Sequence, residues 1–388
     1  MWRYSRIADL DLERFQPAGP EASDVAADPG VAAVAQEIDA VVVTMVDGSP
    51  SIPALPQEWV ARGVVLAQAA DLAEEAAGLG SVAVDAPDVF ATMNDAFTAA
   101  PVVVSVPRGV TLDRPILVHH RLVTPGVAVF PRLVVQLGEG AQATVIDHVS
   151  SSSAAGAVLS VPLTELSVER GARLGYLSFQ DLAADAWQVG SLVARISQEA
   201  NLSAGLIGLG GEYARMRTDC AMAGRGANGD LYAGYFGEGD QTLDFRTFQH
   251  HDAPDTTSNL LFKGAVGGRS RSVYTGLIRV DKAARGTNAF QTNRNVKLSD
   301  TAWAESVPNL EIETNDVRCS HASTVGPVDP EQRFYLESRG VPPTVADRLI
   351  VAGFFDEVVR QMPGGQPVVD AIGVRISEKL DRVEGDLR

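Results

Sequence analysis

The chain has 388 residues and a formal net charge of −17, with 45% hydrophobic and 21% charged residues. This composition is typical of a folded protein with a sizeable core and argues against intrinsic disorder. An acidic surface repels nucleic-acid phosphates and anionic lipid headgroups, so neither nucleic acid nor a membrane is expected as a partner.

Two further sequence features bear on the compartment. No apolar run approaches the roughly 18 residues of a membrane span, and residues 1–6 are not followed by the apolar segment of a secretory signal. Cys220 and Cys319 are the only cysteines, which is too few for a disulfide framework in a chain of this length. A reducing, cytoplasmic location is therefore expected.

Residues 1–100 are predicted to form a small mixed α/β region. The β-branched run 41–46 followed by Asp47-Gly48 predicts a strand that ends in a turn. Residues 63–66 predict a second strand, and 88–99 a short helix with Asp88 as its N-cap.

Residues 101–325 are predicted to form a β-solenoid, because short runs of alternating apolar and polar residues follow one another without a long helical pattern. Small-residue turns recur at intervals of 27 to 31 residues, at Gly140, Gly171, Glu199 and Gly226. Further along, the turns are interpreted as crowding closer, around Thr257, Ser272, Asn288 and Ala302. A sandwich or barrel is also compatible with such strands, but stacked coils explain the spacing better, since each coil needs its neighbours for a core.

Residues 326–388 are predicted to be helical. Asp329-Pro330-Glu331 predicts the start of one helix, and Thr344–Asp347 is interpreted as the capping sequence of the next. A final helix is expected to have one apolar face, formed by Val369, Ile372, Ile376 and Leu380.

The second of these helices is apolar on two sides. One stripe contains Ala346, Leu349, Ile350, Gly353 and Phe354, and the other contains Val351, Phe355 and Val359. A helix of this kind is either buried between two layers or covered by a second protein. Packing against the solenoid explains one stripe; for the stripe of Val351, Phe355 and Val359, burial within the chain and docking of a partner both stay open.

The usual enzyme signatures are absent from the sequence: GxxxxGK[ST], GxGxxG after a strand, HExxH, GxSxG and CxxC. His250-His251-Asp252 offers two imidazoles, but adjacent residues of a strand point to opposite faces and cannot easily share one metal ion. These histidines are interpreted as part of a polar turn with exposed imidazoles.

Cys319-Ser320-His321 is the stronger candidate site. At positions i and i+2 of a strand, the thiol and the imidazole project from the same face. This pair suits iron, zinc or a nascent iron–sulfur unit, but two ligands are too few for a closed site, so a partner chain would have to complete it. The alternative is that Val317, Cys319 and His321 form one packed row with a hydrogen-bonded imidazole.

Several segments resemble the SufB/SufD family of iron–sulfur cluster assembly proteins. The resemblance is densest in the C-terminal signature, which covers Asn309–Gly326 and continues through Glu331–Gly340. Tyr274–Val280 and Gln291–Asn295 are also similar to that family, as are Trp2–Tyr4 and Asp9–Asp11 near the start.

The resemblance implies a right-handed parallel β-helix with flanking helical regions and a non-catalytic scaffold function within a SufBCD complex. It implies contact with SufB across the β-helix ends and with the ATPase SufC, where ATP would be hydrolysed, at the C-terminal helices that carry Val351, Phe355 and Val359. It also implies that His321, with Cys319 as a weaker candidate, faces SufB at a shared site for iron or a transient iron–sulfur cluster. When isolated, the chain is expected to be able to form a homodimer instead.

One departure from the family pattern separates its two branches. SufB-like sequences have a cysteine in the strand that corresponds to Gln291–Asn295, and acidic residues on both sides of the histidine. This chain has no cysteine in that strand, and Ser320 and Ala322 flank His321. The resemblance therefore favours the SufD branch over a SufB-like principal scaffold.

A remote alternative is a β-helix carbohydrate-active enzyme, which would use paired carboxylates on one flat side. That class predicts export, exposed aromatic platforms for sugars and often bound calcium. An aromatic content of 6% and the missing export signal do not favour it.

Overall fold

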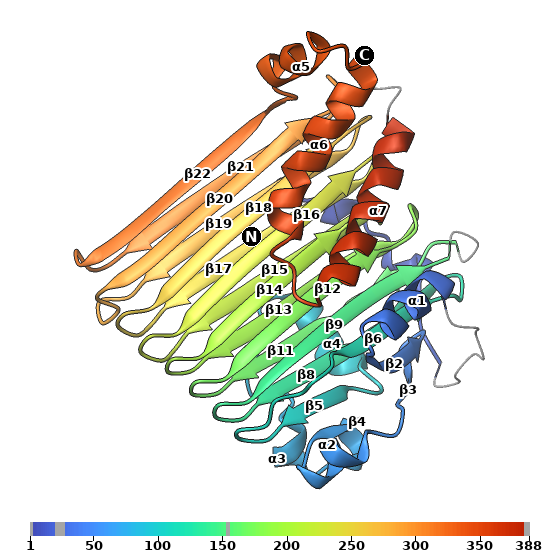
Figure 1. Cartoon of the computed structure of the whole chain (residues 1–388). Helices are drawn as coiled ribbons and strands as arrows, with labels where there is room; N and C mark the ends of the chain where they lie inside the picture. Colours follow the sequence, from blue (N-terminus) through green and yellow to red (C-terminus); the bar gives the residue numbers. More distant parts are fainter. Residues whose placement is uncertain (1–2, 20–27, 153–155, 384–388) are drawn as a thin grey trace.

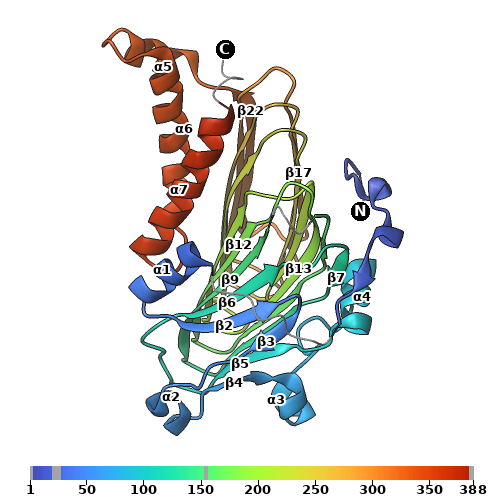
Figure 2. The ribbon, with the colours of Figure 1, turned by 90° about the vertical axis from the view of Figure 1, so that its right-hand side faces the viewer.

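The computed structural model describes residues 3–19, 28–152 and 156–383; Trp2 of the family-like N-terminal segment lies outside these ranges. Two long β-sheets face each other across a common interior, and the chain passes from one sheet to the other as it winds along the molecule (Figures 1 and 2). The predicted fold class, a mainly β chain with a parallel β-solenoid flanked by helices, is confirmed.

Sheet A has 12 strands and sheet B has 10. The main path of sheet A contains, in order, β4 (Val65–Gln68), β5 (Val102–Val106), β8 (Arg132–Leu137), β11 (Leu163–Val168), β13 (Trp187–Ile196), β15 (Tyr213–Met222), β17 (Thr242–His251), β19 (Arg271–Val280) and β21 (Trp303–Ile312). Three short strands join its side: β1 (Gln16–Pro17), β7 (Val127–Val129) and β10 (Leu159–Ser160). Sheet B contains, in order, β3 (Ser49–Ser51), β2 (Val41–Val46), β6 (Ile116–Leu122), β9 (Gln142–Ser151), β12 (Arg173–Asp181), β14 (Asn201–Gly208), β16 (Asn228–Gly237), β18 (Thr257–Val266), β20 (Thr287–Lys297) and β22 (Val317–Pro327).

The coil length varies little along the solenoid and does not shorten toward its end. Paired positions in sheet B repeat at intervals of 27 to 31 residues, at Arg173, Asn201, Asn228, Thr257 and Asn288. The predicted crowding of the later turns is therefore wrong. Thr257 and Asn288 lie at the start of sheet B strands, whereas Ser272 and Ala302 lie at the start of sheet A strands. The four positions therefore belong to two separate series of turns, one for each sheet.

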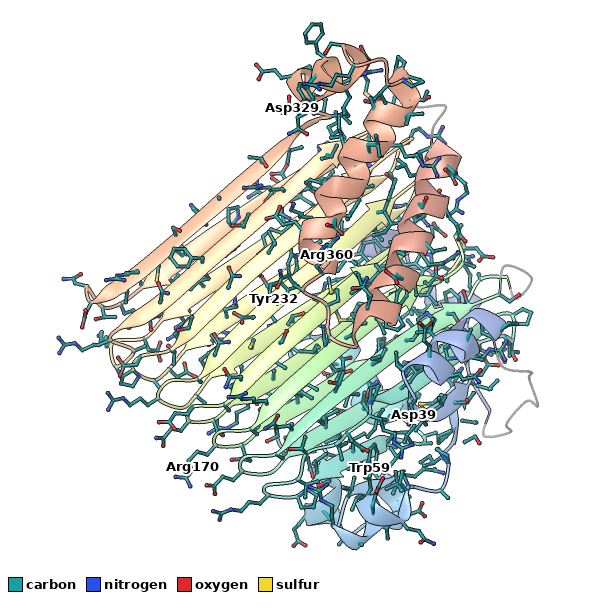
Figure 3. All side chains as sticks on the ribbon, in the orientation of Figure 1. Asp39, Trp59, Arg170, Tyr232, Asp329 and Arg360 are labelled. Carbon is teal, nitrogen blue, oxygen red and sulfur yellow. The ribbon has the colours of Figure 1, made fainter. Side chains whose placement is uncertain are left out.

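The residues at the turns make the 27- to 31-residue repeat recognisable in the sequence. Gly140, Gly171 and Gly226 have left-handed φ angles of 68°, 66° and 70°, and Glu199 takes the same role at 56°. Glycine adopts this conformation without steric cost. The alanine after each of these residues is fully buried, so the small side chain fits where the chain turns into the next strand. The exposed turns project charged side chains, such as Arg170, into solvent (Figure 3).

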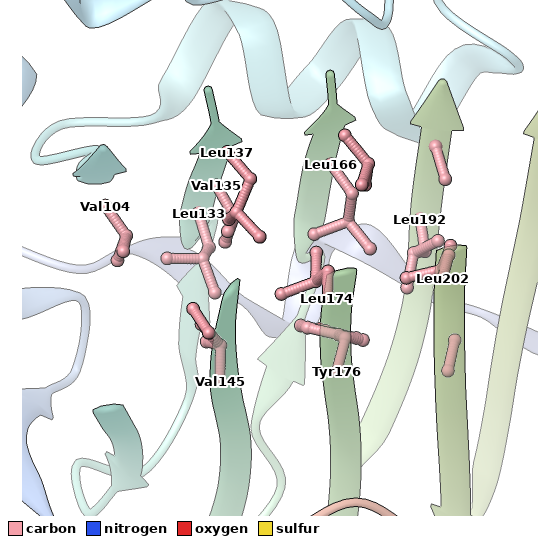
Figure 4. Close-up of a cluster of buried hydrophobic side chains, with 14 of the residues drawn as sticks. Val104, Leu133, Val135, Leu137, Val145, Leu166, Leu174, Tyr176, Leu192 and Leu202 are labelled. Carbon is pink, nitrogen blue, oxygen red and sulfur yellow. The ribbon is translucent and has the colours of Figure 1, made fainter. Parts of the chain in front are cut away.

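Apolar side chains fill the interior of the first coils. Val104, Val135, Leu166, Leu192 and Leu202 extend inward from successive strands of the two sheets and are almost completely buried (Figure 4). Each coil thus supplies part of a continuous core that no coil could form alone.

The N-terminal region contributes strands to both sheets. β2 confirms the predicted strand 41–46 and pairs in parallel with β6, while β4 begins at Val65, two residues later than predicted, and pairs antiparallel with β5. The predicted helix is α4 (Val89–Phe97), and the Asp88 carboxylate accepts the backbone N–H of Phe90 at 3.0 Å as its N-cap. The remaining short elements are α1 (Pro29–Glu37), α2 (Gln57–Ala61), α3 (Glu74–Ala77), η1 (Ile7–Asp9), η2 (Leu12–Arg14) and η3 (Ala69–Asp71).

Three helices follow the solenoid: α5 (Pro330–Glu337), α6 (Pro343–Val359) and α7 (Gln366–Val383). Asp329 caps α5 as predicted, since its carboxylate accepts the Glu331 N–H at 2.9 Å. The predicted cap of the second helix is wrong, because α6 begins at Pro343 and has no side-chain cap. The Asp347 carboxylate lies 3.3 Å from the guanidinium of Arg333 on α5 instead.

Helices α6 and α7 lie on the outer face of sheet B, and the N-terminal segment and α4 lie on the side of sheet A (Figure 2). Figure 3 shows Tyr232 on the outer face of sheet B near Arg360, where α6 ends. Within residues 3–19, 28–152 and 156–383, no helix is both long and apolar enough to cross a lipid bilayer.

The contacts of α6 correct the docking prediction. Val351, Phe355 and Val359 are buried against sheet B, and the Phe355 ring stacks on Phe236 of β16 at a centroid distance of 6.0 Å. In this arrangement they cannot form a docking surface, because the solenoid already covers them. The other stripe is the more exposed one: Leu349 keeps 52% of its surface exposed.

Candidate functional site

The solenoid ends at two edge strands, β21 of sheet A and β22 of sheet B, and each has a neighbouring strand on one side only within the described part of the chain. The outer edge of such a strand presents backbone N–H and C=O groups that have no partner in the ladder. This end of the solenoid can therefore pair with another chain.

Both candidate ligands lie on β22. Cys319 is opposite Ala289 of β20, and His321 is opposite Gln291, in the parallel register. Ala289 and Gln291 are buried inside the solenoid, so Cys319 and His321 belong to the row that faces the interior. His321 is exposed because no further coil covers it.

Cys319 is in a different environment from His321. Its side chain is half-buried and packs against an apolar cluster that contains Ile278, Val280 and Ala284. This burial raises the pKa of the Cys319 thiol. Because the thiolate is the form that binds a metal, the environment favours a packing role for Cys319 more than a role as a ligand.

Part of the interior beneath this end is polar, in contrast to the apolar first coils. The Tyr235 hydroxyl donates to Asn295 Oδ1 at 2.8 Å and accepts from Asn293 Nδ2 at 2.9 Å. Asn295 Nδ2 in turn donates to Asn293 Oδ1 at 2.8 Å. The row of His321 therefore lies over an apolar cluster at Cys319 and over a hydrogen-bonded polar layer at the positions opposite Asn293 and Asn295.

A complete metal site is not formed by the described residues alone: they contain no cluster of three or more His, Cys, Asp or Glu side chains that could hold a metal ion. His321 and Cys319 provide two donor atoms at most, and a closed site for zinc or an iron–sulfur cluster needs more. Further ligands would have to come from another molecule.

Of the adjacent histidines His250 and His251, only His251 has a structural role in the interior. His250 and His251 lie within β17, and they point to opposite faces as predicted. The interpretation as an exposed turn is wrong for His251, which is fully buried with Nδ1 2.8 Å from Thr256 Oγ1 and Nε2 3.0 Å from Ser258 Oγ. The alternating pattern continues through residue 251, so this residue belongs to the strand.

Three histidines escaped the sequence analysis. His120 is buried inside the solenoid with Nε2 2.9 Å from Asp147 Oδ1, whereas His119 and His148 stack on the outer face of sheet B. The alternation of adjacent residues in the strand containing His119 and His120 could have indicated their opposite directions. The partners could not have been found, because they depend on the register between strands.

Burial makes the stability of the protein sensitive to acid. Removal from water lowers the pKa of His119 to about 3 and the pKa values of His148 and His251 to about 4. The folded state keeps these groups neutral while the unfolded state binds protons below pH 6.5, so stability is lost as the pH falls from 6.5 toward 4. Each group is expected to cost about 1–2 kcal/mol between pH 6.5 and pH 5.

Urea unfolding at pH 7.5 and pH 5 measures this effect. The His251→Gln variant is expected to lose less stability on acidification than the unchanged protein. His250→Gln, on the outer face of the same strand, should keep the original pH dependence. Equal acid losses in the His251→Gln variant and the unchanged protein would contradict the assignment.

Cys220, the other cysteine, is fully buried in the interior with its Sγ 3.9 Å from Met222 Sδ. Burial raises the pKa of its thiol to about 12. It acts as a small apolar side chain and not as a nucleophile or ligand.

The fold defines a β-solenoid whose last described strand in sheet B exposes an imidazole, that of His321. A sequence model described as "SUF system FeS cluster assembly, SufBD core domain" matches residues 120–354. An iron–sulfur cluster assembly SufBD family protein of Mycobacterium bovis is 36% identical, over 74% of this chain and 72% of that protein. A SufBD family protein of Mycobacterium leprae is 34% identical over 73% of both chains.

The chain belongs to the SufBD family of iron–sulfur cluster assembly proteins. Among its relatives is the iron–sulfur cluster assembly protein SufD of Escherichia coli, which is 29% identical over 97% of this chain and 88% of that protein. This similarity therefore extends beyond the solenoid to the N-terminal region and the C-terminal helices.

Proposed function

We propose that the chain is a SufD-like, non-catalytic scaffold subunit that contributes His321 to an iron or iron–sulfur site shared with a SufB-like partner. The main support is the position of His321, exposed on the last strand of sheet B where the sheet edge is unpaired. The partner brings the sulfur ligands, because β20 has no cysteine and Cys319 is half-buried. Because one imidazole cannot hold iron or a cluster alone, the site is complete only while this chain and the partner are together.

The edges of β21 and β22 provide the contact with the SufB-like partner. An added strand on each edge would continue both sheets across the interface through main-chain hydrogen bonds. The same edges allow a second copy of this chain to bind when the partner is missing, which accounts for the expected homodimer. The SufD-like assignment rests on the nearly full-length similarity to the Escherichia coli protein and on the missing β20 cysteine.

The C-terminal helices provide the contact with a SufC-like ATPase in the cytoplasm, where ATP is hydrolysed by that partner. The side chains available for this contact are those that the solenoid leaves uncovered. Phe334 and Tyr335 of α5 are 71% and 56% exposed, and Val345 and Leu349 of α6 are 44% and 52% exposed. Movement of the ATPase would then reach the solenoid through α6, which is fixed to β18 by Lys263 and Glu357.

Two variants distinguish the exposed side chains of α5 and α6 from the buried stripe of α6. Phe355→Ala is expected to reduce the free energy of unfolding by about 3–5 kcal/mol, since it leaves a cavity against sheet B. Phe334→Asp with Leu349→Asp is expected to change stability by less than about 1 kcal/mol but to weaken ATPase binding at least about tenfold. Urea unfolding and co-purification of the anaerobically expressed three-protein complex measure the two effects.

The opposite pattern would refute this assignment. If the double variant on the exposed face co-purified with the ATPase at the normal ratio, the docking site would lie elsewhere. If no stable complex with SufB-like and SufC-like partners formed even with the unchanged chain, the scaffold function itself would be excluded.

A further inference from the structure

The two free edges at the open end of the solenoid differ in their proline content. Strands β21 and β22 form these edges, one in each sheet (Figure 1). β21 has Pro308 near its middle, whereas β22 has no proline before its last residue, Pro327. Proline has no backbone N–H, and its ring occupies the space of the missing hydrogen. The side of β21 toward which Pro308 points therefore decides what this residue does.

Pro308 points to the free edge and not to the neighbouring strand β19. Backbone N–H groups of successive residues in a strand point alternately to its two sides. At the start of β21, the Trp303 N–H donates to Ser270 O at 3.0 Å, and just after its end the Glu313 N–H donates to the β19 residue Val280 at 2.9 Å. The register between the two strands has no interruption. The odd-numbered residues of β21 therefore bond to β19, and the even-numbered ones, which include Pro308, face outward.

This position costs the isolated chain no hydrogen bond of the ladder, but it obstructs a strand that is added to the edge. Such a strand would meet a missing donor and a ring at Pro308. Natural edge strands use proline in this way against pairing. Main-chain pairing along β21 is therefore interrupted at Pro308, whereas β22 can be extended without a break.

A second copy of this chain has no means of avoiding the obstacle. Its own edge strands are regular, since β21 and β22 pair with their neighbours without any skipped position. Whichever of these strands faces Pro308, one of its carbonyl groups loses a hydrogen bond. A strand with a β-bulge is different, because it bends and leaves a residue unpaired at the bulge.

We propose that Pro308 selects the partner at this end of the solenoid: it hinders a second copy of this chain and favours a SufB-like chain whose facing strand has a β-bulge opposite Pro308. The inference rests on the proposed function, in which both edges receive the partner. It adds a residue that makes the binding of the partner and the binding of a second copy unequal.

The Pro308→Ala variant tests the selection. Alanine restores the N–H and adds no side-chain surface, so a gain in affinity would belong to main-chain pairing. Self-association is expected to tighten at least about fivefold, while the affinity for the SufB-like partner changes by less than about twofold. Analytical ultracentrifugation of the whole chain, alone and with the partner, measures both dissociation constants. Pro254→Ala, in an exposed turn, should leave both unchanged.

The Ser306→Pro variant gives the reciprocal test. Ser306 is the preceding even-numbered residue, so its N–H also faces outward and the variant should fold normally, which urea unfolding checks. A second proline widens the obstacle beyond the position of the bulge. Self-association and partner binding should therefore both weaken at least about fivefold.

Two results would overturn the proposal. One is equal self-association of Pro308→Ala and the unchanged chain, including none by either of them. The other is an equal tightening of both complexes by Pro308→Ala, because Pro308 would then not discriminate between partners. If Pro308→Ala does not fold, Ser306→Pro still decides: undiminished partner binding by this variant would mean that the partner does not pair with β21.

The same measurements separate this inference from the proposed function. If the unchanged chain formed no complex with a SufB-like partner, the proposed function itself would fail. If that complex formed while Pro308→Ala had no effect on self-association, only the role of Pro308 would be refuted.

Discussion

Replacing His321 with alanine is expected to lower the iron retained by the anaerobically assembled complex at least about tenfold, while the three proteins still co-purify. Even indirect changes around a metal ligand commonly cost 10- to 100-fold in affinity, and this change removes the imidazole itself. The side chain is exposed on an edge strand, so its loss leaves the solenoid folded. Iron and acid-labile sulfide per complex, measured after gel filtration, give the result.

Two controls show whether the effect belongs to the site. His250→Ala removes a half-buried imidazole from the outer face of sheet A and should leave the iron content unchanged. Cys319→Ala should retain most of the iron, because the raised pKa of this half-buried thiol disfavours the thiolate. Iron content equal to that of the unchanged complex in the His321→Ala variant would exclude a ligand role.

Placing charges on the last strand is expected to prevent assembly without unfolding the chain. Ser323 and Val325 of β22 lie on the same row as His321, and both are exposed. Substituting both with lysine puts two cations where a partner would have to desolvate them, a device that natural edge strands use against pairing. Affinity for the SufB-like partner should fall by more than about 100-fold.

Analytical ultracentrifugation of the purified proteins measures this loss, and urea unfolding shows whether the variant chain is intact. Asn259→Lys is the matched control, since Asn259 is exposed on β18, the third strand from the end, which is paired with a strand on both sides. It should assemble normally. Normal assembly by the Ser323→Lys and Val325→Lys double variant would mean that the partner does not use this edge.

Much of the fold could be predicted because it is encoded locally. Small residues with left-handed φ, such as Gly140 and Gly171, mark each coil in the sequence, and each is followed by a buried alanine. The cap of α4 was readable from Asp88 for the same reason, since an N-cap is a contact between near neighbours in the chain. Local signals failed at α6, where the apolar pattern shows two stripes but not which of them the solenoid covers.

The candidate site was predictable only in part. Alternation along a strand is enough to place Cys319 and His321 on one face. It cannot show that Cys319 is packed while His321 is exposed, because this difference depends on β22 being the last strand and on the cluster around Ile278. The rings of His119 and His148 stack although the two residues are far apart in the sequence. Only the register between coils brings them together.

Pulsed electron paramagnetic resonance of the reduced, cluster-loaded complex gives the most direct test of whether this chain supplies a metal ligand. The complex is prepared with ¹⁵N-labelled histidine in this chain alone. A ¹⁵N coupling to the iron centre is expected with the unchanged chain and should disappear in His321→Ala but persist in His250→Ala. A coupling that survives in His321→Ala, or none with the unchanged chain, would contradict the account.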